Sequence, residues 1–280
     1  MSRTTAAVKP FVRDRFTWLA YVMLAYFAYL EAVIGPLMPF LRSELKLNYT
    51  QAALHSSALA FGLVLGGLLA DRAVRWWNRQ VVFWGGGGGM AAGAVILALG
   101  PHPAFTIFGT WVMGFLGTFL ITTIQSSLAD HHGPHRTIAL TEANIAASIS
   151  ASLSPLLVGG FQRIGVGWQG GLLLPASIWV FAAFGFSRDP VPAALPQTPD
   201  LRGQRRALPI TFWVYWIVMM LTVAVEWSII VWGAEYLVSV ADLSKADASI
   251  TMSLFFVAMV IGRTVGSRLS RVADTGRLVL

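Results

Sequence analysis

Ala25-Tyr-Phe-Ala-Tyr-Leu-Glu31-Ala-Val-Ile-Gly-Pro36 carries one acidic residue inside an otherwise apolar run. A second acid in the same setting, Glu226, follows 195 positions later, in Leu221-Thr-Val-Ala-Val-Glu226-Trp-Ser-Ile-Ile-Val-Trp232. An ionisable group is costly in hydrocarbon, so such residues usually face the interior of a helix bundle or a watery cavity. The two stretches therefore indicate membrane helices that carry an acid at a matching depth.

The match between the two halves of the chain resumes after one extra residue in the following loop. From there the corresponding positions are 196 apart, as in Leu47 with Leu243, Ala52 with Ala248, Gly66 with Gly262, Arg72 with Arg268 and Arg75 with Arg271. Identical residues are sparse, so the support for a repeat comes from chemistry that recurs at the same place in the hydropathy pattern. A duplicated half with an acid at the same depth in both copies is typical of a transporter with a site between repeats.

The composition is that of a membrane protein. Hydrophobic residues make up 56% of the 280 residues, and the mean hydropathy is +0.65, whereas soluble domains have roughly 45–50% apolar residues. Charged residues make up only 12%, about half the usual share. The chain has no cysteine, which excludes disulfides and thiolate metal sites and leaves the redox compartment open.

Eight apolar stretches are each long enough to cross a bilayer, which takes about 20 residues. Their approximate limits are Thr17–Phe40, Gln51–Ala70, Val81–Leu99, Ala104–Leu128, Ile138–Gly160, Val166–Phe186, Ile210–Val231 and Ala248–Val265. Because a segment in lipid must satisfy its own backbone hydrogen bonds, we expect helices and hence an all-α membrane protein. The first stretch is too long for a signal-peptide core and lacks a small-residue cleavage site, so we expect the mature protein to retain it.

The basic residues predict the orientation. With the amino terminus in the cytoplasm, 16 of the 20 lysines and arginines fall in inner segments, and four fall in outer ones, namely Arg42, Lys46, Arg163 and Lys245. This bias follows the positive-inside rule and predicts a multi-pass protein of the cell membrane with a cytoplasmic amino terminus. The net charge of +7 therefore follows from topology, and no nucleic-acid partner is expected.

A polar connection rich in proline divides the chain at residues 187–209. It contains Pro190, Pro192, Pro196 and Pro199, followed by Arg202, Arg205 and Arg206. Proline cannot continue a helix there, and the arginines favour the inner leaflet. We therefore expect an N-terminal six-helix bundle over residues 1–186, a cytoplasmic linker over 187–209 and a partial C-terminal bundle of two helices over 210–280.

Six helices, a basic linker and a second copy of the same unit resemble the major facilitator superfamily of transporters. The most specific local similarity is Gly67-Leu-Leu-Ala-Asp71-Arg72-Ala-Val-Arg75, which is similar to the loop signature after the second span of that family. The resemblance implies a bundle of about twelve spans, so the chain looks truncated after its eighth helix. The repeat aligns Leu280 with Trp84, near the start of the third stretch. Either the sequence is a fragment, or something else completes the second bundle.

In that family the loop is part of a gate, and Gly67, Asp71, Arg72 and Arg75 are the matching residues. The resemblance implies that Asp71 takes part in a latch against a late helix of the second half. The alternative is that the arginines only anchor the loop at the inner surface. We favour the gate, because topology alone does not require an acid inside a basic cluster.

Two other signatures of the family match less well. Many proton-coupled members carry an arginine in the fourth span, but Trp111-Val-Met-Gly-Phe-Leu-Gly117 has none. Ser154-Pro155-Leu-Leu-Val-Gly159-Gly160 resembles an antiporter motif, with serine in place of its glycine and a longer spacing. The direction of transport and its coupling therefore stay open, and Pro155 predicts a kink.

Polar residues within the spans are the candidates for a substrate and proton pathway. Glu31 and Gly35 are one turn apart on the first span, and Tyr215, Thr222, Glu226 and Gly233 share a face of the seventh by helical spacing. A central glutamate can gain and lose a proton as water access alternates, so we expect Glu31 and Glu226 to carry the coupling. The alternative is that each is a structural acid bonded to a neighbouring helix.

The fourth and fifth spans add a polar seam. It is formed by Thr118, Thr122, Gln125, Asn144, Ser148 and Ser152, with Glu142 near the inner surface. Gln125, Glu142 and Asn144 are candidates for lining the cavity, whereas we assign the serines to contacts between helices. Tyr26, Tyr29, Trp227 and Trp232 lie deeper and either stack on a planar substrate or simply pack. His55 could relay protons, but we interpret it as a surface histidine near the outer end.

Two conspicuous patterns are not expected to carry chemistry. The glycines from Gly85 to Gly89 lack a following Gly-Lys-Ser/Thr and a preceding strand, so they indicate tight helix contact rather than a phosphate loop. His131-His132-Gly-Pro-His135 has a proline between the possible ligands, and we expect no metal there. No cofactor is expected.

The sequence thus predicts a secondary transporter that moves a small solute by alternating access and is coupled to protons through Glu31 and Glu226. A cationic substrate would also suit two acids. A truncated, inactive transporter and a membrane receptor or assembly partner stay open as alternatives. A membrane enzyme is not expected, because no nucleophile, base and acid lie together within the spans.

Overall fold

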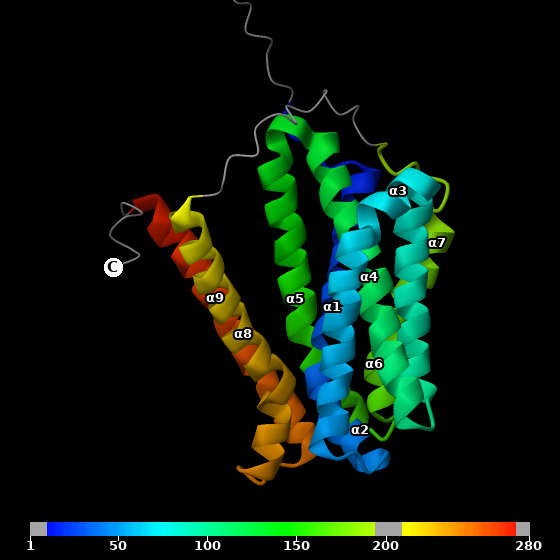
Figure 1. Ribbon diagram of the computed structural model, residues 1–280, viewed down its shortest axis with the longest axis vertical. Helices are drawn as coiled ribbons and strands as arrows, with labels where there is room; N and C mark the ends of the chain where they lie inside the picture. Colours follow the sequence, from blue (N-terminus) through cyan, green and yellow to red (C-terminus); the bar gives the residue numbers. More distant parts are fainter. Residues whose placement is uncertain (1–9, 194–208, 273–280) are drawn as a thin grey trace, which may run out of the picture.

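The computed structural model describes residues 10–193 and 209–272, with the side chains of α9 described to Gly262 and at Val265. Figure 1 labels the α-helices, α1 to α9. The elements are α1 (Arg15–Ala32), α2 (Ile34–Glu44), α3 (Tyr49–Leu99), α4 (Pro103–His132), η1 (Gly133–His135), α5 (Arg136–Arg163), α6 (Trp168–Ala176), α7 (Ile178–Phe186), α8 (Ile210–Ser239) and α9 (Lys245–Val272). The described chain is an all-α protein with apolar helices, as the sequence predicts.

The first predicted span is broken into α1 and α2, which meet at Val33 at an angle of 42°. Pro36 explains the break, because it has no N–H to donate to the carbonyl of Ala32 and its ring crowds that carbonyl. The sixth predicted span is divided into α6 and α7 at Ser177, two residues after Pro175. Both breaks lie inside single crossings.

α3 contains two crossings rather than one. Its 51 residues would make a straight helix about 77 Å long, more than twice the hydrocarbon thickness of about 30 Å. The backbone leaves helical geometry at Asn78, where φ is +66°. Gly62 and Gly89 both lie against α4, at Gly114 and Leu116 respectively, so the chain has doubled back between them. The two arms correspond to the second and third predicted spans.

Five helical runs are long and apolar enough to cross a membrane, and the bent pair α1–α2 makes a sixth. Two of these six runs contain two crossings each, because α3 doubles back and the run 103–163 consists of α4, η1 and α5. The described chain therefore holds the eight predicted spans. Six of them precede residue 187, and α8 and α9 lie together to one side of these (Figure 1).

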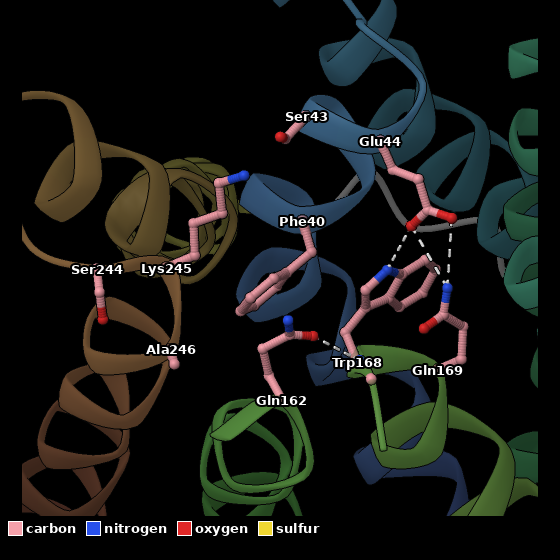
Figure 2. A pocket seen from close by; sticks show the side chains of 10 residues that line it. Phe40, Ser43, Glu44, Gln162, Trp168, Gln169, Ser244, Lys245 and Ala246 are labelled. Carbon is pink, nitrogen blue, oxygen red and sulfur yellow. Dashed lines mark hydrogen bonds between the residues drawn. The ribbon is translucent and has the colours of Figure 1, made fainter. Parts of the chain in front are cut away.

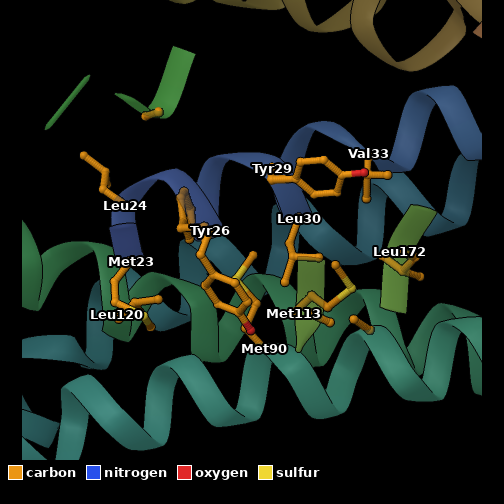
Figure 3. Packing of buried hydrophobic residues seen from close by; sticks show 14 of the residues in the cluster. Met23, Leu24, Tyr26, Tyr29, Leu30, Val33, Met90, Met113, Leu120 and Leu172 are labelled. Atoms are coloured by element: carbon orange, nitrogen blue, oxygen red, sulfur yellow. The ribbon is translucent and has the colours of Figure 1, made fainter. Parts of the chain in front are cut away.

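We call the end of the bundle where α1 and α8 begin the amino-terminal end, and the end where α2 and α8 finish the far end. The core lies around α1, whose side chains are buried on nearly all sides. Figure 3 shows Met23, Leu30, Met90, Met113 and Leu120, from α1, α3 and α4, packed around Tyr26. The Tyr26 hydroxyl donates to the Gly87 carbonyl at 2.9 Å, which satisfies its only polar group inside this core.

The glycine run in α3 allows close helix contact, as expected. Added Cβ atoms at Gly87 and Gly88 would meet the ring of Trp179 at 2.7 Å, and one at Gly86 would meet the Leu120 backbone nitrogen at 2.8 Å. Gly85 faces open space. Without side chains on these positions, α4 and α7 approach the backbone of α3 directly.

The structure supports the internal repeat. α1 begins at Arg15 and α8 at Ile210, 195 positions apart, whereas α3 begins at Tyr49 and α9 at Lys245, 196 apart. The extra residue lies in the intervening turn. The Leu47 N–H bonds to the Arg42 carbonyl, five residues back, but the corresponding Leu243 N–H bonds to Leu237, six residues back.

Equivalent caps begin the next helix in each repeat. Asn48 accepts from the N–H of Gln51, and its counterpart Ser244 accepts from the N–H of Asp247. Lys46 and Asp242, also equivalent, both have a φ of +53°. The predicted pairs of Arg72 with Arg268 and of Arg75 with Arg271 lie outside the side chains that the structure describes in the second repeat.

Substitution by alanine distinguishes glycines that contact a neighbouring helix from glycines that face open space. At Gly114 an added Cβ would collide with the carbonyl oxygen of Leu59, so Gly114→Ala should lower the thermal midpoint in detergent by several degrees, as overpacking of about 1–3 kcal/mol implies. Gly85→Ala is the matched control, because the same methyl meets nothing and alanine is the better helix former. Equal midpoints for the two variants would contradict this packing.

Candidate functional site

The two repeats meet at the far end of the molecule. An added Cβ at Gly35 would collide with the carbonyl oxygen of Ile230, and one at Gly159 would lie 2.7 Å from the carbonyl oxygen of Ala246. The Ser249 hydroxyl donates to the Pro155 carbonyl at 3.0 Å. In Figure 1, α8 and α9 lean away from α5 toward the amino-terminal end, where α8 is exposed over residues 211–225.

Two ion pairs reinforce this contact. Arg42 at the end of α2 pairs with Glu235 of α8, which is only 4% exposed. Arg163 at the end of α5 pairs with Asp247 of α9. The Arg42 guanidinium also lies 4.0 Å from the centroid of the Tyr49 ring. These two ion pairs and the Ser249–Pro155 hydrogen bond join the repeats at the far end.

Gly35 and Ile230 occupy equivalent positions, 195 apart. Equivalent residues of a two-fold repeat that touch each other lie close to its pseudo-symmetry axis. Glu31 and Glu226 each lie four residues before this contact, about one helical turn toward the amino-terminal end. The geometry therefore brings both acids to the same level, just inside the point where the repeats close.

Glu31 lines a cavity of about 220 Å³ between the repeats. Ser56, Leu59 and Leu63 of α3 form one wall, and Trp227 and Val231 of α8 form the opposite wall. Glu226, next to Trp227, is half-buried. The Thr222 hydroxyl donates to the Val218 carbonyl of its own helix, and its side chain is exposed.

In the polar seam of α4 and α5, Thr118 is buried, and the other side chains are exposed or half-buried. Gln125 and Asn144 are exposed, and the Asn144 amide donates to the Leu140 carbonyl at 2.7 Å. The hydroxyls of Ser148 and Ser152 donate to carbonyls four residues back in α5. These serines therefore bond to their own helix, and the interpretation that they join helices is wrong for these hydrogen bonds.

Two residues lie elsewhere than the sequence suggests. Tyr26 is 1% exposed inside the N-terminal bundle, so its ring is covered by the core and not free to meet a substrate. His55 is fully buried rather than on the surface, with Nδ1 2.8 Å from the Gln51 carbonyl and Nε2 2.8 Å from the Thr106 hydroxyl. The residues that flank His55 in the sequence do not reveal that α4 supplies this threonine.

Glu142 lies at the amino-terminal end, in a cluster that holds the segment before α1. Its carboxylate pairs with Arg13 at 2.5 Å and accepts from the Tyr21 hydroxyl at 3.0 Å. Asp14 caps α1 by accepting from the Thr17 N–H at 2.8 Å, and it pairs with His131 at 2.6 Å. Among the residues the structure describes, no group of three or more His, Asp or Glu side chains could hold a metal ion.

The predicted gate residues lie near the turn in α3. Asp71 pairs with Arg75 at 2.5 Å, one turn away on the same helix, and both side chains are more than 60% exposed. Gly67 and Arg72 are exposed beside them. An exposed pair of this kind contributes little stability by itself.

Sequence reasoning missed a more buried pair close to this turn. Arg79, which is 9% exposed, bonds to Asp130 of α4 at 2.7 Å and to the Pro192 carbonyl at 3.2 Å. The adjacent Gln80 side chain bonds to backbone atoms of Ser187, Asp189 and Val191. These bonds attach the start of the linker to the turn of α3, at the amino-terminal end of the bundle. In the sequence, the signal that could have indicated this cluster is the adjacent pair of Arg79 and Gln80 at a turn.

The Asp14 cap predicts a pH dependence. Partial burial opposes ionisation of Asp14, but hydrogen bonds from Thr17 and His131 outweigh it and hold the pKa of Asp14 below its ordinary value. A depressed pKa adds stability above the unfolded pKa of about 3.9 and loses it as the pH falls through the folded value. Asp14→Asn should therefore lower the thermal midpoint by a few degrees at pH 7, and the difference from wild type should shrink toward pH 3.

Asp242→Asn is the matched control for this measurement, because Asp242 is exposed at the far end. A constant difference between Asp14→Asn and wild type from pH 7 to pH 3 would show that the charge of Asp14 does not stabilise the fold.

Comparison with known proteins gives a family and a fold. The family model described as Major Facilitator Superfamily matches residues 17–280. A bacterial homolog of the human lysosomal transporter Spinster, solved in an inward-facing and unoccupied conformation, superposes with a TM-score of 0.75 at 16% identity. That match covers 92% of this chain and 62% of the other. No curated protein sequence matches the chain.

A second solved structure, a mutant of the peptide transporter POT in complex with sulfate, superposes with a TM-score of 0.54 at 15% identity. That match covers 94% of this chain and 54% of the other. At such identities these likenesses concern the fold alone. The chain spans less than two thirds of the length of either transporter structure.

Proposed function

The chain belongs to the Major Facilitator Superfamily, and we propose that it forms the solute pathway of a secondary transporter that works by alternating access. In this proposal the protein lies in the cell membrane with its amino terminus in the cytoplasm, as the distribution of 16 inner and four outer basic residues favours. The N-terminal bundle (1–186), linker (187–209) and partial C-terminal bundle (210–280) are its functional parts.

One observation carries the proposal: the contacts between the repeats extend from the far end to about the level of Glu31, where Ala32, Ile230 and Phe256 form a buried cluster. Gly35 against Ile230 and Arg42 against Glu235 close that end, while α8 is exposed along its first half. A pathway that is closed on one side of a central acid and divergent on the other corresponds to one of the two states that alternating access requires. In the proposed orientation this state opens toward the cytoplasm.

Glu31 and Glu226 are the proposed carriers of the coupling proton. Support comes from their equivalent positions in the repeats and from the cavity that Glu31 lines with Trp227 and Val231. A carboxylate there meets water from one side in one state and from the other side in the other state. It can therefore take a proton on one face of the membrane and release it on the other.

Other residues have supporting parts in this proposal. Gln125, Asn144 and Thr222 are exposed on α4, α5 and α8 and are proposed to line the wider part of the pathway. Glu142 lies at the same end, engaged with Arg13. Gly67, Asp71, Arg72 and Arg75 are proposed to act at the gate when the amino-terminal end closes. The solute is a small molecule, and the two acids would also suit a cationic one.

Spin labels can test the movement, because the chain has no native cysteine. Ser43→Cys with Val238→Cys reports on the far end, since both residues line one cavity between the repeats. Trp18→Cys with Trp213→Cys reports on the amino-terminal end, where each residue is the fourth in its helix. We expect a short distance for the first pair and a longer one for the second, with opposite changes as the pH or the solute is varied. Distances that rise and fall together would contradict alternating access.

Replacing the acids tests the coupling. In the same labelled chains, Glu31→Gln and Glu226→Gln should abolish the dependence of the distances on pH between 5 and 8, because glutamine cannot exchange a proton. In proteoliposomes these variants should lose solute uptake driven by a pH gradient, by at least about tenfold, but keep exchange of labelled for unlabelled solute. Asp242→Asn, an exposed acid outside the pathway, serves as the control and should behave as wild type.

The outcomes separate the alternatives. Loss of both driven uptake and exchange in the glutamine variants would favour a cationic substrate held by the acids. Unchanged pH dependence would reject both acids as proton carriers. Solute binding without any flux in the wild-type chain would favour a receptor or assembly partner over a transporter.

A further inference from the structure

The few basic residues of the far end are concentrated at the contact between the repeats. Three of the four, Arg42, Lys46 and Lys245, line one cavity of about 360 Å³. α2 and the turn after it supply one wall, and Glu235 and Val238 of α8 with Lys245 of α9 supply the other. The fourth, Arg163, pairs with Asp247 nearby. Topology disfavours basic residues at an outer end, so it does not account for this grouping.

The cations of the cavity exceed its acids. Glu235, the acid of the lining, is paired with Arg42, whose guanidinium also lies over the Tyr49 ring. The nearby Glu44 accepts from the Trp168 indole N–H at 2.8 Å and also binds Gln169, and it points away from the cavity wall that Lys245 forms (Figure 2). Arg42 and Glu235 balance each other, so Lys46 and Lys245 give the cavity lining an excess of two positive charges.

Lys46 stands where the backbone favours glycine. Its φ is +53°, and it occupies the position after the end of α2 where a Leu47 N–H to Arg42 carbonyl bond of 2.9 Å closes the turn. Helices that end with this bond usually carry glycine there, because a Cβ is strained in the left-handed region. The lysine therefore keeps its charge at this place at some expense of backbone strain.

Lys245 reaches across the interface. Figure 2 shows its side chain extending from the start of α9 toward Ser43 at the end of α2. It is half-buried and lines both this cavity and the neighbouring one beside Phe40 and Trp168. Its ammonium group is thus held near the first repeat although its backbone belongs to the second.

We propose that this cavity is a binding site for a small anion bearing a phosphate or carboxylate group, held between Lys46 and Lys245. Both cations donate hydrogen bonds, and the acid of the lining, Glu235, is paired with Arg42, so an added anion would balance their charge. Because the two lysines come from different repeats, the bound anion joins the repeats and stabilises the closed far end. That last effect on transport rests on the proposed function, whereas the binding itself does not.

Inorganic phosphate is the probe for the site. Thermal unfolding of the purified chain is followed in detergent while phosphate is titrated at a constant ionic strength kept with potassium chloride. We expect a saturable rise of the midpoint for wild type, because a ligand that binds only the folded state stabilises it. Lys245→Gln and Lys46→Gln should each weaken the apparent affinity by about tenfold, as loss of one charged hydrogen bond implies.

A glycine at position 46 gives the sharpest variant. Lys46→Gly should raise the midpoint without phosphate, because glycine relieves the strained backbone, and should at the same time weaken the response to phosphate. A purely structural lysine would not combine these two effects. Lys46→Arg and Lys245→Arg keep the charge and should keep the response even if a glutamine variant fails to fold.

Arg136→Gln is the matched control, because it removes an exposed charge at the opposite end, and its response should equal that of wild type. An unchanged response in the doubly substituted Lys46→Gly/Lys245→Gln chain would overturn the site. An equal loss in Arg136→Gln would reduce the effect to net charge and would overturn it as well.

Nanodiscs distinguish the two sources of such an anion. If the occupant is a soluble anion, free phosphate should bind equally in nanodiscs of anionic and of zwitterionic lipid. If lipid headgroups fill the site, anionic lipid should abolish the response to free phosphate and Lys245→Gln should restore equality between the two lipids. Failure of alternating access with retained phosphate binding would leave the site standing and reject only its link to transport.

Discussion

The contact of Gly35 with the backbone of Ile230 determines how the two repeats are joined. No side chain separates the two helices there, so the repeats meet backbone to backbone at equivalent positions. Ion pairs and a hydroxyl bond then add directional contacts on either side, from Arg42 to Glu235 and from Ser249 to Pro155. The central acids take their level from this point. A larger residue at position 35 would push apart the helices on which Glu31 and Glu226 are carried.

The buried charged side chains also join distant parts of the chain. Glu235 is nearly enclosed and is compensated by Arg42, because an unpaired carboxylate in such a place would be strongly destabilising. At the amino-terminal end, Arg79 is equally enclosed and is compensated by Asp130 and a linker carbonyl. Each end thus has one buried charged side chain, Glu235 or Arg79, whose partner comes from a distant part of the chain, and both pairs join segments that have to stay in register.

The spans, the repeat and the level of the two acids could be predicted from the sequence, because hydropathy and spacing depend on residues close together along the chain. The break at Val33 follows from Pro36, so it too has a local cause. Tyr26, His55 and Arg79 could not be placed, because their partners Gly87, Thr106 and Asp130 lie about 50 or more residues away. For polar side chains in an apolar span, the sequence reveals that a partner is needed but not which helix provides it.

The buried His55 has one further consequence, which concerns the direction of a single hydroxyl. The Gln51 carbonyl can only accept, so Nδ1 of the ring carries a hydrogen. The Thr106 hydroxyl lies within reach of both Nε2 and the Pro103 carbonyl, at 2.8 Å and 3.0 Å, but has one hydrogen to donate. With a neutral ring that hydrogen turns toward the imidazole, and with a doubly protonated ring it turns toward the carbonyl. The direction of the Thr106 hydroxyl therefore depends on whether His55, buried between α3 and α4, carries one proton or two.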